Sequence, residues 1–197
     1  MIRHGLQVQA LRDFMILQGP SRNITLMEWD KLWSLNHTLL ETQAPRYNAL
    51  QETDIVAIEL VDIESNTVVQ IPLHPKDTTK GVKDVVRSKI IYVDQQDACN
   101  FVQGEEVTLI SWGNIRIDKI VRSDDGAKVT HIMATTHIDG DFKTTKWKVQ
   151  WIGCNSLQEL QHGVCIEYGP IITVKQPGDQ QTLEEIVNRT SILKAPV

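Results

Sequence analysis

The chain has 197 residues, of which 41% are hydrophobic, and its 20 Lys and Arg against 25 Asp and Glu give a formal net charge of −5. This composition predicts a folded chain of one domain or two small ones, and it argues against a protein that binds nucleic acid through a uniformly basic surface. No apolar run is long enough to cross a bilayer and no leader pattern opens the sequence, so we expect a cytoplasmic protein without a membrane partner.

Motifs for catalysis and metal binding are missing from the sequence. Three cysteines, Cys99, Cys154 and Cys165, form no CxxC pair, which favours free thiols over disulfides or a zinc site. The six histidines form no HxxxH or HxH pattern, and neither a nucleophile elbow nor a glycine-rich phosphate loop occurs. We therefore expect no catalytic residue, no metal site and no cofactor in this chain.

A helical hairpin is predicted at the N-terminus. Thr25 and Glu28 form a capping-box pattern, so a helix is expected from about Met27 until Pro45 interrupts it. Apolar residues recur at helical spacing along it, at Trp29, Leu32, Leu35 and Leu39. A preceding helix over residues 6–18 is expected to stop at Gly19-Pro20.

From about residue 54 the pattern becomes β-rich. Strands are predicted over residues 55–63, 67–71, 85–93, 107–111, 114–122, 128–136, 144–151 and 163–168, with hairpin turns at 65–66 and 124–126. Many short strands joined by local turns indicate antiparallel barrels or sandwiches. A last short helix is expected over residues 183–188, opened by a capping box of Thr182 and Glu185.

Basic residues gather in two places. Lys146 and Lys148 are two apart in a predicted strand and project to one face, where they could meet phosphates together with Lys143; protection of a sheet edge is an equally good explanation. A second group comprises Lys76, Lys80, Lys83, Arg87 and Lys89. Even spacing also places Trp147 and Trp151 on one face, where core packing is favoured over base stacking.

Three motifs in a fixed order resemble one enzyme family. They are EWDKLWSLN followed by APRY within residues 28–47, GEEVTLISWGNI at 104–115, and DFKTTKWKVQWI at 141–152. Each is similar to a segment of the glutamyl-tRNA synthetases of the archaeal and eukaryotic type, which are class I enzymes that join glutamate to tRNA(Glu) with ATP and Mg. The HIGH-like and KMSKS-like catalytic motifs of that family are not found here. The resemblance implies the C-terminal tRNA-binding region of such an enzyme.

The resemblance also implies a fold and a domain division. It implies a mainly β structure with an N-terminal helical hairpin and two antiparallel L25-like β-barrels, of which the proximal one could be incomplete. Residues 1–50 would be a helical subdomain that contacts the tRNA stem. Residues 51–197 would be the anticodon-binding region, with the distal barrel inserted over roughly 94–165.

Several residues are expected to contact RNA because they match positions in the family. In related glutaminyl enzymes the arginine of the APR motif contacts the middle anticodon uridine, and the matching residue is Arg46, although a surface arginine that caps the preceding helix is the alternative. The other expected contacts are Arg22, Asn114, Arg116, Lys143, Lys146, Lys148 and Lys76. Where glutaminyl enzymes read the first anticodon base with arginines, this chain has Thr108 and Ile110, so that reading is not carried over.

Three hypotheses follow from the sequence. The first is the anticodon-binding portion of a cytoplasmic glutamyl-tRNA synthetase, which positions tRNA and performs no chemistry. The second is a barrel that contacts other proteins of a synthetase complex, which the acidic composition permits. The third is an L25-like barrel that binds ribosomal RNA, but such a barrel would not need the helical hairpin.

Overall fold

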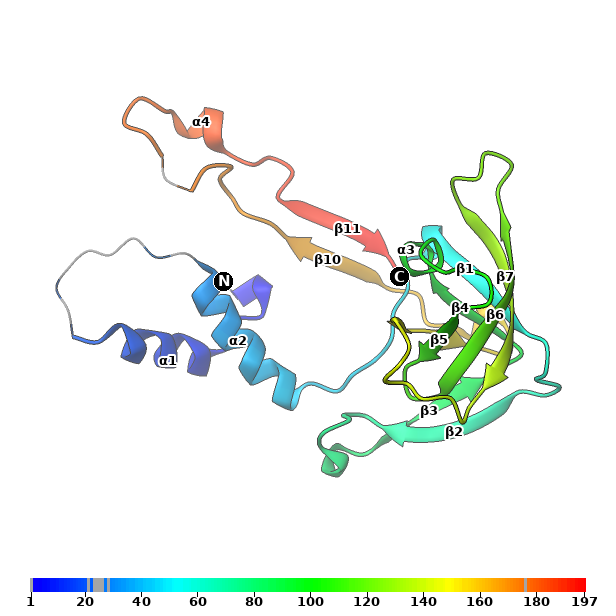
Figure 1. Cartoon of the computed structure of the whole chain (residues 1–197). Helices are drawn as coiled ribbons and strands as arrows, with labels where there is room; N and C mark the ends of the chain where they lie inside the picture. Colours follow the sequence, from blue (N-terminus) through cyan, green and yellow to red (C-terminus); the bar gives the residue numbers. More distant parts are fainter. Residues whose placement is uncertain (1, 21, 23–26, 28, 176) are drawn as a thin grey trace. The chain divides into compact units, whose positions relative to one another are not determined.

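The computed structural model describes residues 2–20, 22, 27, 29–175 and 177–197 (Figure 1). The chain forms two compact units. One comprises Met1–Pro45 with Cys165–Ala195, and the other comprises Arg46–Val164 with Pro196–Val197. Among the described residues, no helix is both long and apolar enough to cross a membrane.

The first unit contains the predicted helical hairpin. A 3-10 turn (Ile2–His4) precedes α1 (Val8–Gln18), which ends at Gly19 with φ of 70°, and α2 (Trp29–Gln43) follows. Both helices confirm the sequence prediction, whereas the capping box of Thr25 and Glu28 lies outside the described residues. Asn36 of α2 accepts a hydrogen bond from the backbone N–H of Gln7 at 2.7 Å and so fixes the start of α1. Trp29 is 57% exposed and does not belong to a core.

A two-stranded sheet completes the first unit. It pairs β10 (Val164–Tyr168) with β11 (Ile192–Pro196), and α4 (Leu183–Ile186) lies between them in sequence. The capping box of Thr182 and Glu185 that opens α4 is confirmed. The ring of His4 stacks on Trp33 at 5.1 Å and lies 5.5 Å from the ring of Tyr168, so it contacts both the helical hairpin and β10.

A curled sheet of seven strands forms the second unit, in the order β8-β5-β6-β7-β1-β4-β9 (Figure 1). Its strands are β1 (Ile55–Leu60), β4 (Ile90–Asp94), β5 (Glu106–Leu109), β6 (Gly113–Arg122), β7 (Val129–His137), β8 (Trp147–Val149) and β9 (Ile152–Gly153). A separate hairpin pairs β2 (Thr67–Pro72) with β3 (Val82–Arg87). Short helical segments also occur in this unit: α3 (Gln95–Ala98) is a single α-helical turn, and Glu52–Asp54, Thr78–Lys80 and Leu157–Glu159 are 3-10 turns.

One face of this sheet forms the core, because apolar residues alternate along its strands. In β1, Val56, Ile58 and Leu60 are completely buried while their neighbours are only partly covered. The same alternation places Ile115 and Ile117 of β6 in the core. Burial of each such side chain contributes about 1.5–3 kcal/mol. The structure is therefore mainly β with few helices, and the curled sheet is barrel-like.

Three expectations about the strands were wrong. Residues 85–93 form two strands because the Ser88 hydroxyl donates to the Ile90 carbonyl at 2.5 Å and closes a turn between them. Residues 144–151 form only the short β8, because residues 141–144 make a turn. The sheet is also not purely antiparallel, since β1 pairs with β7 and β5 pairs with β8 in parallel.

Candidate nucleic-acid interface

The loop between β7 and β8, residues 138–146, carries two exposed lysines, Lys143 and Lys146, and we call it the lysine loop. The backbone N–H of Lys143 donates to the side chain of Asp141 at 2.8 Å, and the Thr144 hydroxyl donates to the Asp141 carbonyl at 2.8 Å. These bonds form a tight turn around Asp141, as short polar side chains often do. The turn leaves the side chain of Lys143 exposed.

The two following lysines confirm the predicted alternation. Lys146 and Lys148 are exposed, while Trp147 is partly covered and Val149 is buried. The ammonium group of Lys146 lies 4.7 Å from the centre of the Trp147 ring, and that of Lys148 donates to the Thr145 carbonyl at 2.8 Å. Both lysine side chains are exposed, so an anion can reach them.

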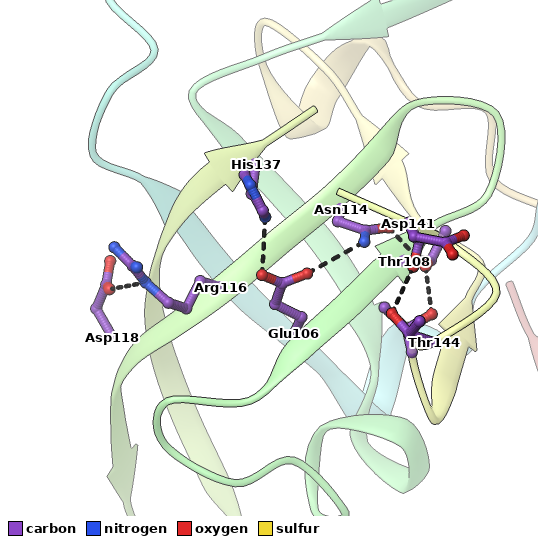
Figure 2. Close-up of polar contacts among 9 residues, drawn as sticks. Glu106, Thr108, Asn114, Arg116, Asp118, His137, Asp141 and Thr144 are labelled. Atoms are coloured by element: carbon purple, nitrogen blue, oxygen red, sulfur yellow. Dashed lines mark hydrogen bonds and ion pairs between the residues drawn. The ribbon is translucent and has the colours of Figure 1, made fainter. Parts of the chain in front are cut away.

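A polar network lies beneath the lysine loop, on the outer face of β5 and β6 (Figure 2). Asn114 is its centre and has no exposed surface. Its carbonyl oxygen accepts from the Thr108 hydroxyl at 2.7 Å, and its amide donates to Glu106 at 3.2 Å. Thr108 also contacts the hydroxyl of Thr145 in the loop at 2.6 Å, and Glu106 contacts His137 Nδ1 at 2.7 Å. The network joins three strands to the loop.

Arg116 lies next to this network. It faces Glu106 in the β5–β6 register, and its Nε is 3.8 Å from a carboxylate oxygen of Asp118. The side chain remains 59% exposed. Thr135 donates to the other oxygen of Asp118 at 2.6 Å and holds that carboxylate in place. Arg116 can thus present the outer part of its guanidinium to a ligand on the same face.

Arg46 begins the second unit, and its backbone is tightly held. Its N–H donates to the Leu73 carbonyl at 2.9 Å, and its own carbonyl accepts from the ammonium group of Lys83 at 2.6 Å. That ammonium group also lies 5.3 Å from the centre of the Tyr47 ring, and its burial lowers the pKa of Lys83. The Arg46 side chain is exposed.

Lys76 lies on the loop at the tip of the β2–β3 hairpin. Its backbone N–H donates to Nδ1 of His74 at 3.2 Å, and His74 is only 2% exposed. The Asp77 side chain accepts from the backbone of Thr79 at 3.1 Å and starts the turn Thr78–Lys80. The loop has a defined shape, and the Lys76 side chain is exposed on it.

The second basic cluster predicted from the sequence does not form one surface. Lys89 pairs with Glu59 at 3.1 Å, and Lys83 is bound to the Arg46 carbonyl. Arg87 donates to the Ser111 carbonyl at 3.1 Å and lies 5.5 Å from the centre of the Trp112 ring. Three of the five basic side chains therefore hold parts of the protein together.

The structure brings together five of the eight expected contact residues, namely Asn114, Arg116, Lys143, Lys146 and Lys148, on or around the outer face of β5, β6 and β8. Asn114 is buried and serves the network, so it presents no surface to a ligand. Arg46 and Lys76 lie near the β2–β3 hairpin, and Arg22 is exposed in the other unit. Among the residues that the structure describes, no group of three His, Cys, Asp or Glu side chains could hold a metal ion.

Sequence reasoning missed Glu106, Thr108 and Thr145 as members of this network. The available signal was the alternation of polar residues at 106 and 108 with the buried Val107 and Leu109. That alternation indicates one polar face, but it does not reveal that a loop covers it.

Comparison with known proteins assigns part of the second unit to a family. Residues 44–137 match the model of the anticodon-binding domain of the class I tRNA synthetases for glutamate and glutamine. This segment belongs to that domain family. Of the expected contacts, Arg46, Lys76, Asn114 and Arg116 lie inside the match, and the lysine loop begins directly after it.

Curated relatives extend the similarity along nearly the whole chain. The bifunctional glutamate/proline–tRNA ligase of Mus musculus is 33% identical over 192 residues, which is 97% of this chain and 12% of the relative. The cytoplasmic glutamate–tRNA ligase of Arabidopsis thaliana is 35% identical over 189 residues (95% and 26%), and that of Saccharomyces cerevisiae 32% over 186 residues (94% and 25%). The chain thus spans between about an eighth and a quarter of the length of these ligases.

Proposed function

We propose that this chain is the tRNA-binding portion of a cytoplasmic glutamate–tRNA ligase and that it binds the anticodon arm of tRNA(Glu). Attachment of glutamate, with ATP and Mg, would take place elsewhere in the complete protein. The two-barrel architecture, with a helical subdomain over residues 1–50 and a distal barrel over roughly 94–165, belongs to this proposal. The assignment to a glutamate–tRNA ligase is supported by the match to the anticodon-binding family and by the cytoplasmic ligases among the relatives.

The main evidence for RNA binding is the lysine loop together with Lys148. Three exposed lysine side chains lie within six residues of one stretch of backbone, and the Arg116 side chain is exposed as well. Ammonium and guanidinium groups at such positions contact phosphate oxygens and fix the register of a nucleic acid. The net charge of −5 is compatible with this, because charges farther away than about 8–10 Å are screened at physiological salt.

Base recognition is proposed for Arg46. Its backbone is fixed on both sides by Leu73 and Lys83, so the exposed side chain starts from a defined position. A guanidinium offers planar, forked donors that suit a base edge exposed in an anticodon loop.

A protein-binding role within a synthetase complex is the alternative, and one observation favours it. The helical hairpin exposes large apolar side chains, namely Val8, Met15, Ile16, Leu17 and Trp29, each more than half accessible. Exposed apolar groups of this kind are typical of protein contact surfaces. An L25-like ribosomal-RNA function has no comparable support.

The deciding experiment measures binding of the full chain to tRNA(Glu) transcripts over a range of salt concentrations. A second transcript carries an unrelated anticodon in the same body. We expect affinity to fall with salt, with a log-log slope of about −0.7 to −0.9 for each phosphate contact, and to fall when the anticodon is replaced. Equal affinity for both transcripts contradicts anticodon recognition. An affinity that does not change with salt contradicts the proposal that the exposed lysines bind phosphate groups.

A matched pair of variants locates the contact. Lys143→Gln and Lys119→Gln each remove one exposed positive charge, but only the first lies in the lysine loop. We expect Lys143→Gln to make the salt slope shallower by about 0.7 to 0.9. Lys119→Gln should leave the slope unchanged, and equal effects of both would indicate attraction by net charge alone.

A further inference from the structure

We infer that Asn114 is a positioning residue, which locks the lysine loop onto the outer face of the sheet and so presents Lys143 and Lys146 to the RNA backbone. This inference rests on the proposed tRNA binding for its functional part. Its structural part concerns only the loop and can be tested without RNA.

Burial is the first argument. Asn114 and Arg116 point to the same outer side of β6, yet Arg116 is exposed and Asn114 has no accessible surface. The lysine loop makes the difference, since it closes over Asn114 at Gly140. A Cβ atom on Gly140 would lie 2.6 Å from the Asn114 amide nitrogen and 2.9 Å from His137 Nδ1. Only glycine permits this close approach of the loop.

The number of available hydrogen atoms determines which group donates in each hydrogen bond of the network. Each threonine hydroxyl has a single hydrogen. Thr108 donates to the Asn114 carbonyl oxygen, so its contact with Thr145 must use the Thr145 hydrogen, which lies between the Thr108 hydroxyl at 2.6 Å and the Phe142 carbonyl at 3.0 Å. The Asn114 amide then donates to one oxygen of Glu106, and His137 Nδ1–H donates to the other. All four bonds run toward the Glu106 carboxylate, and Asn114 is the one member that both accepts and donates within the chain through two different atoms.

This polarity makes an aspartate at position 114 incompatible with the network. A carboxylate there could still accept from Thr108, but it would place a second negative oxygen at 3.2 Å from that of Glu106. Like charges at this distance repel strongly when they are shielded from water. Asn114→Asp keeps the shape of the side chain but replaces its donor by a negatively charged acceptor, so it tests the direction of the bonds.

The lysines differ in how they depend on this lock. Lys143 and Lys146 lie on the loop, whereas Lys148 belongs to β8, which is paired with β5. Release of the loop should therefore remove the contribution of Lys143 and Lys146 to binding. Lys148 should keep most of its contribution, because β5 holds its backbone and only the bond from its ammonium group to the Thr145 carbonyl involves the loop. A mobile lysine loses more conformational freedom on binding than a fixed one, and this lowers affinity.

The experiment has a part without RNA and a part with it. Amide hydrogen exchange of residues 138–146 is compared between the wild-type full chain, Asn114→Asp and Thr135→Val. Thr135 lies on the same sheet face and bonds Asp118, away from the loop, so it is the matched control. We expect exchange of the loop to accelerate at least about tenfold in Asn114→Asp, which corresponds to about 1.4 kcal/mol and lies within the usual cost of a buried group that loses its partner. Thr135→Val should leave it unchanged.

The second part is a double-variant comparison on tRNA(Glu). In the wild-type background, Lys143→Gln and Lys148→Gln should each weaken binding. In the Asn114→Asp background, Lys143→Gln should have no further effect while Lys148→Gln keeps most of its effect, since only interacting sites deviate from additivity. If Asn114→Asp does not fold, Gly140→Ala replaces it, because its methyl group pushes the loop away without a change of charge.

The outcomes separate the two claims. Unchanged exchange of the loop in a folded Asn114→Asp or Gly140→Ala protein overturns the lock. Faster exchange together with fully additive effects of Lys143→Gln overturns the role of the lock in RNA binding. A wild-type chain that does not bind tRNA refutes the proposed function, and with it the functional half of this inference, while the exchange data still decide the structural half.

Discussion

The ammonium group of Lys83 donates a 2.6 Å hydrogen bond to the carbonyl oxygen of Arg46. This bond and the one from the Arg46 N–H to Leu73 hold the backbone of Arg46. Both bonds use main-chain atoms of Arg46, so they remain possible when its side chain is replaced, and melting curves of the variants monitor the rest of the fold.

We expect Arg46→Ala to weaken binding of tRNA(Glu) by about 1–3 kcal/mol, the range for a bidentate base contact, and to reduce discrimination at the middle anticodon base. Binding is measured on transcripts with uridine or another base at that position. Arg46→Lys keeps the charge but loses the fork, so it should restore affinity and not discrimination. Equal losses on both transcripts would make Arg46 a phosphate contact, and a lower melting temperature with intact discrimination would favour a helix-capping role.

Gly153 in β9 is expected to tolerate no larger residue. A Cβ there would lie 2.1 Å from the Val86 carbonyl oxygen and 2.8 Å from the Ser88 hydroxyl. Gly153→Ala should lower the free energy of unfolding by about 1–3 kcal/mol, the usual cost of overpacking. Gly163→Ala is the control, because its Cβ would meet its nearest atom at 3.6 Å, an ordinary contact. Urea titration measures the free energy of unfolding of both variants. Equal values for the two would contradict the close approach of β9 to the Val86 carbonyl.

Truncation in the core should be far more costly than truncation on the surface of the same strand. Ile117 has no exposed surface in β6, whereas Lys119 two residues later is exposed. We expect Ile117→Ala to lower the free energy of unfolding by about 2–5 kcal/mol and Lys119→Ala to change it by about 0.5 kcal/mol or less. A small loss for Ile117→Ala would mean that this side of the sheet is not the core.

The pH dependence of stability should contain a contribution from Asp62. Partial burial raises the pKa of this carboxyl group, but hydrogen bonds from the hydroxyl and the backbone N–H of Thr136 outweigh it, so the pKa lies below its usual value. A depressed pKa contributes stability above the unfolded-state pKa of about 4, and that contribution disappears as the pH falls through the folded-state pKa. The stability difference between wild type and Asp62→Asn should therefore shrink below about pH 4.

Thr136→Val tests the same interaction from the side of the hydrogen-bond donor. It removes the hydroxyl donor to Asp62 and keeps the size of the side chain, so its stability difference from wild type should shrink over the same pH range. If the stability differences between these variants and wild type stay constant down to the acid transition, the hydrogen bonds do not stabilise the ionised carboxylate of Asp62.

Local signals in the sequence predicted much of the secondary structure. The helical spacing around Leu32 and the Gly19-Pro20 stop were sufficient for the hairpin of α1 and α2, and Asp-Gly at 125–126 was sufficient for the β6–β7 turn, where Gly126 has φ of 70°. These features depend on neighbours in the chain, so the sequence contains them directly.

Features that depend on distant residues were not predictable in the same way. The parallel pairing of β1 with β7 joins segments more than seventy residues apart, and no local pattern encodes it. For the site, the alternation of Lys146 and Lys148 was correct, but Asn114 was expected to face a ligand. Its burial depends on a loop that returns to it through Gly140, and only the fold reveals that return.

The position of β1 between β4 and β7 has a consequence for synthesis of the chain. One edge of β1 pairs with β4 soon after both leave the ribosome, but its other edge stays open until Ala134 has been made to meet Leu60. Such late closure slows folding and leaves an unpaired strand edge that other chains can join. The nascent protein is therefore most vulnerable to aggregation before β7 emerges, and a chaperone would help most in that interval.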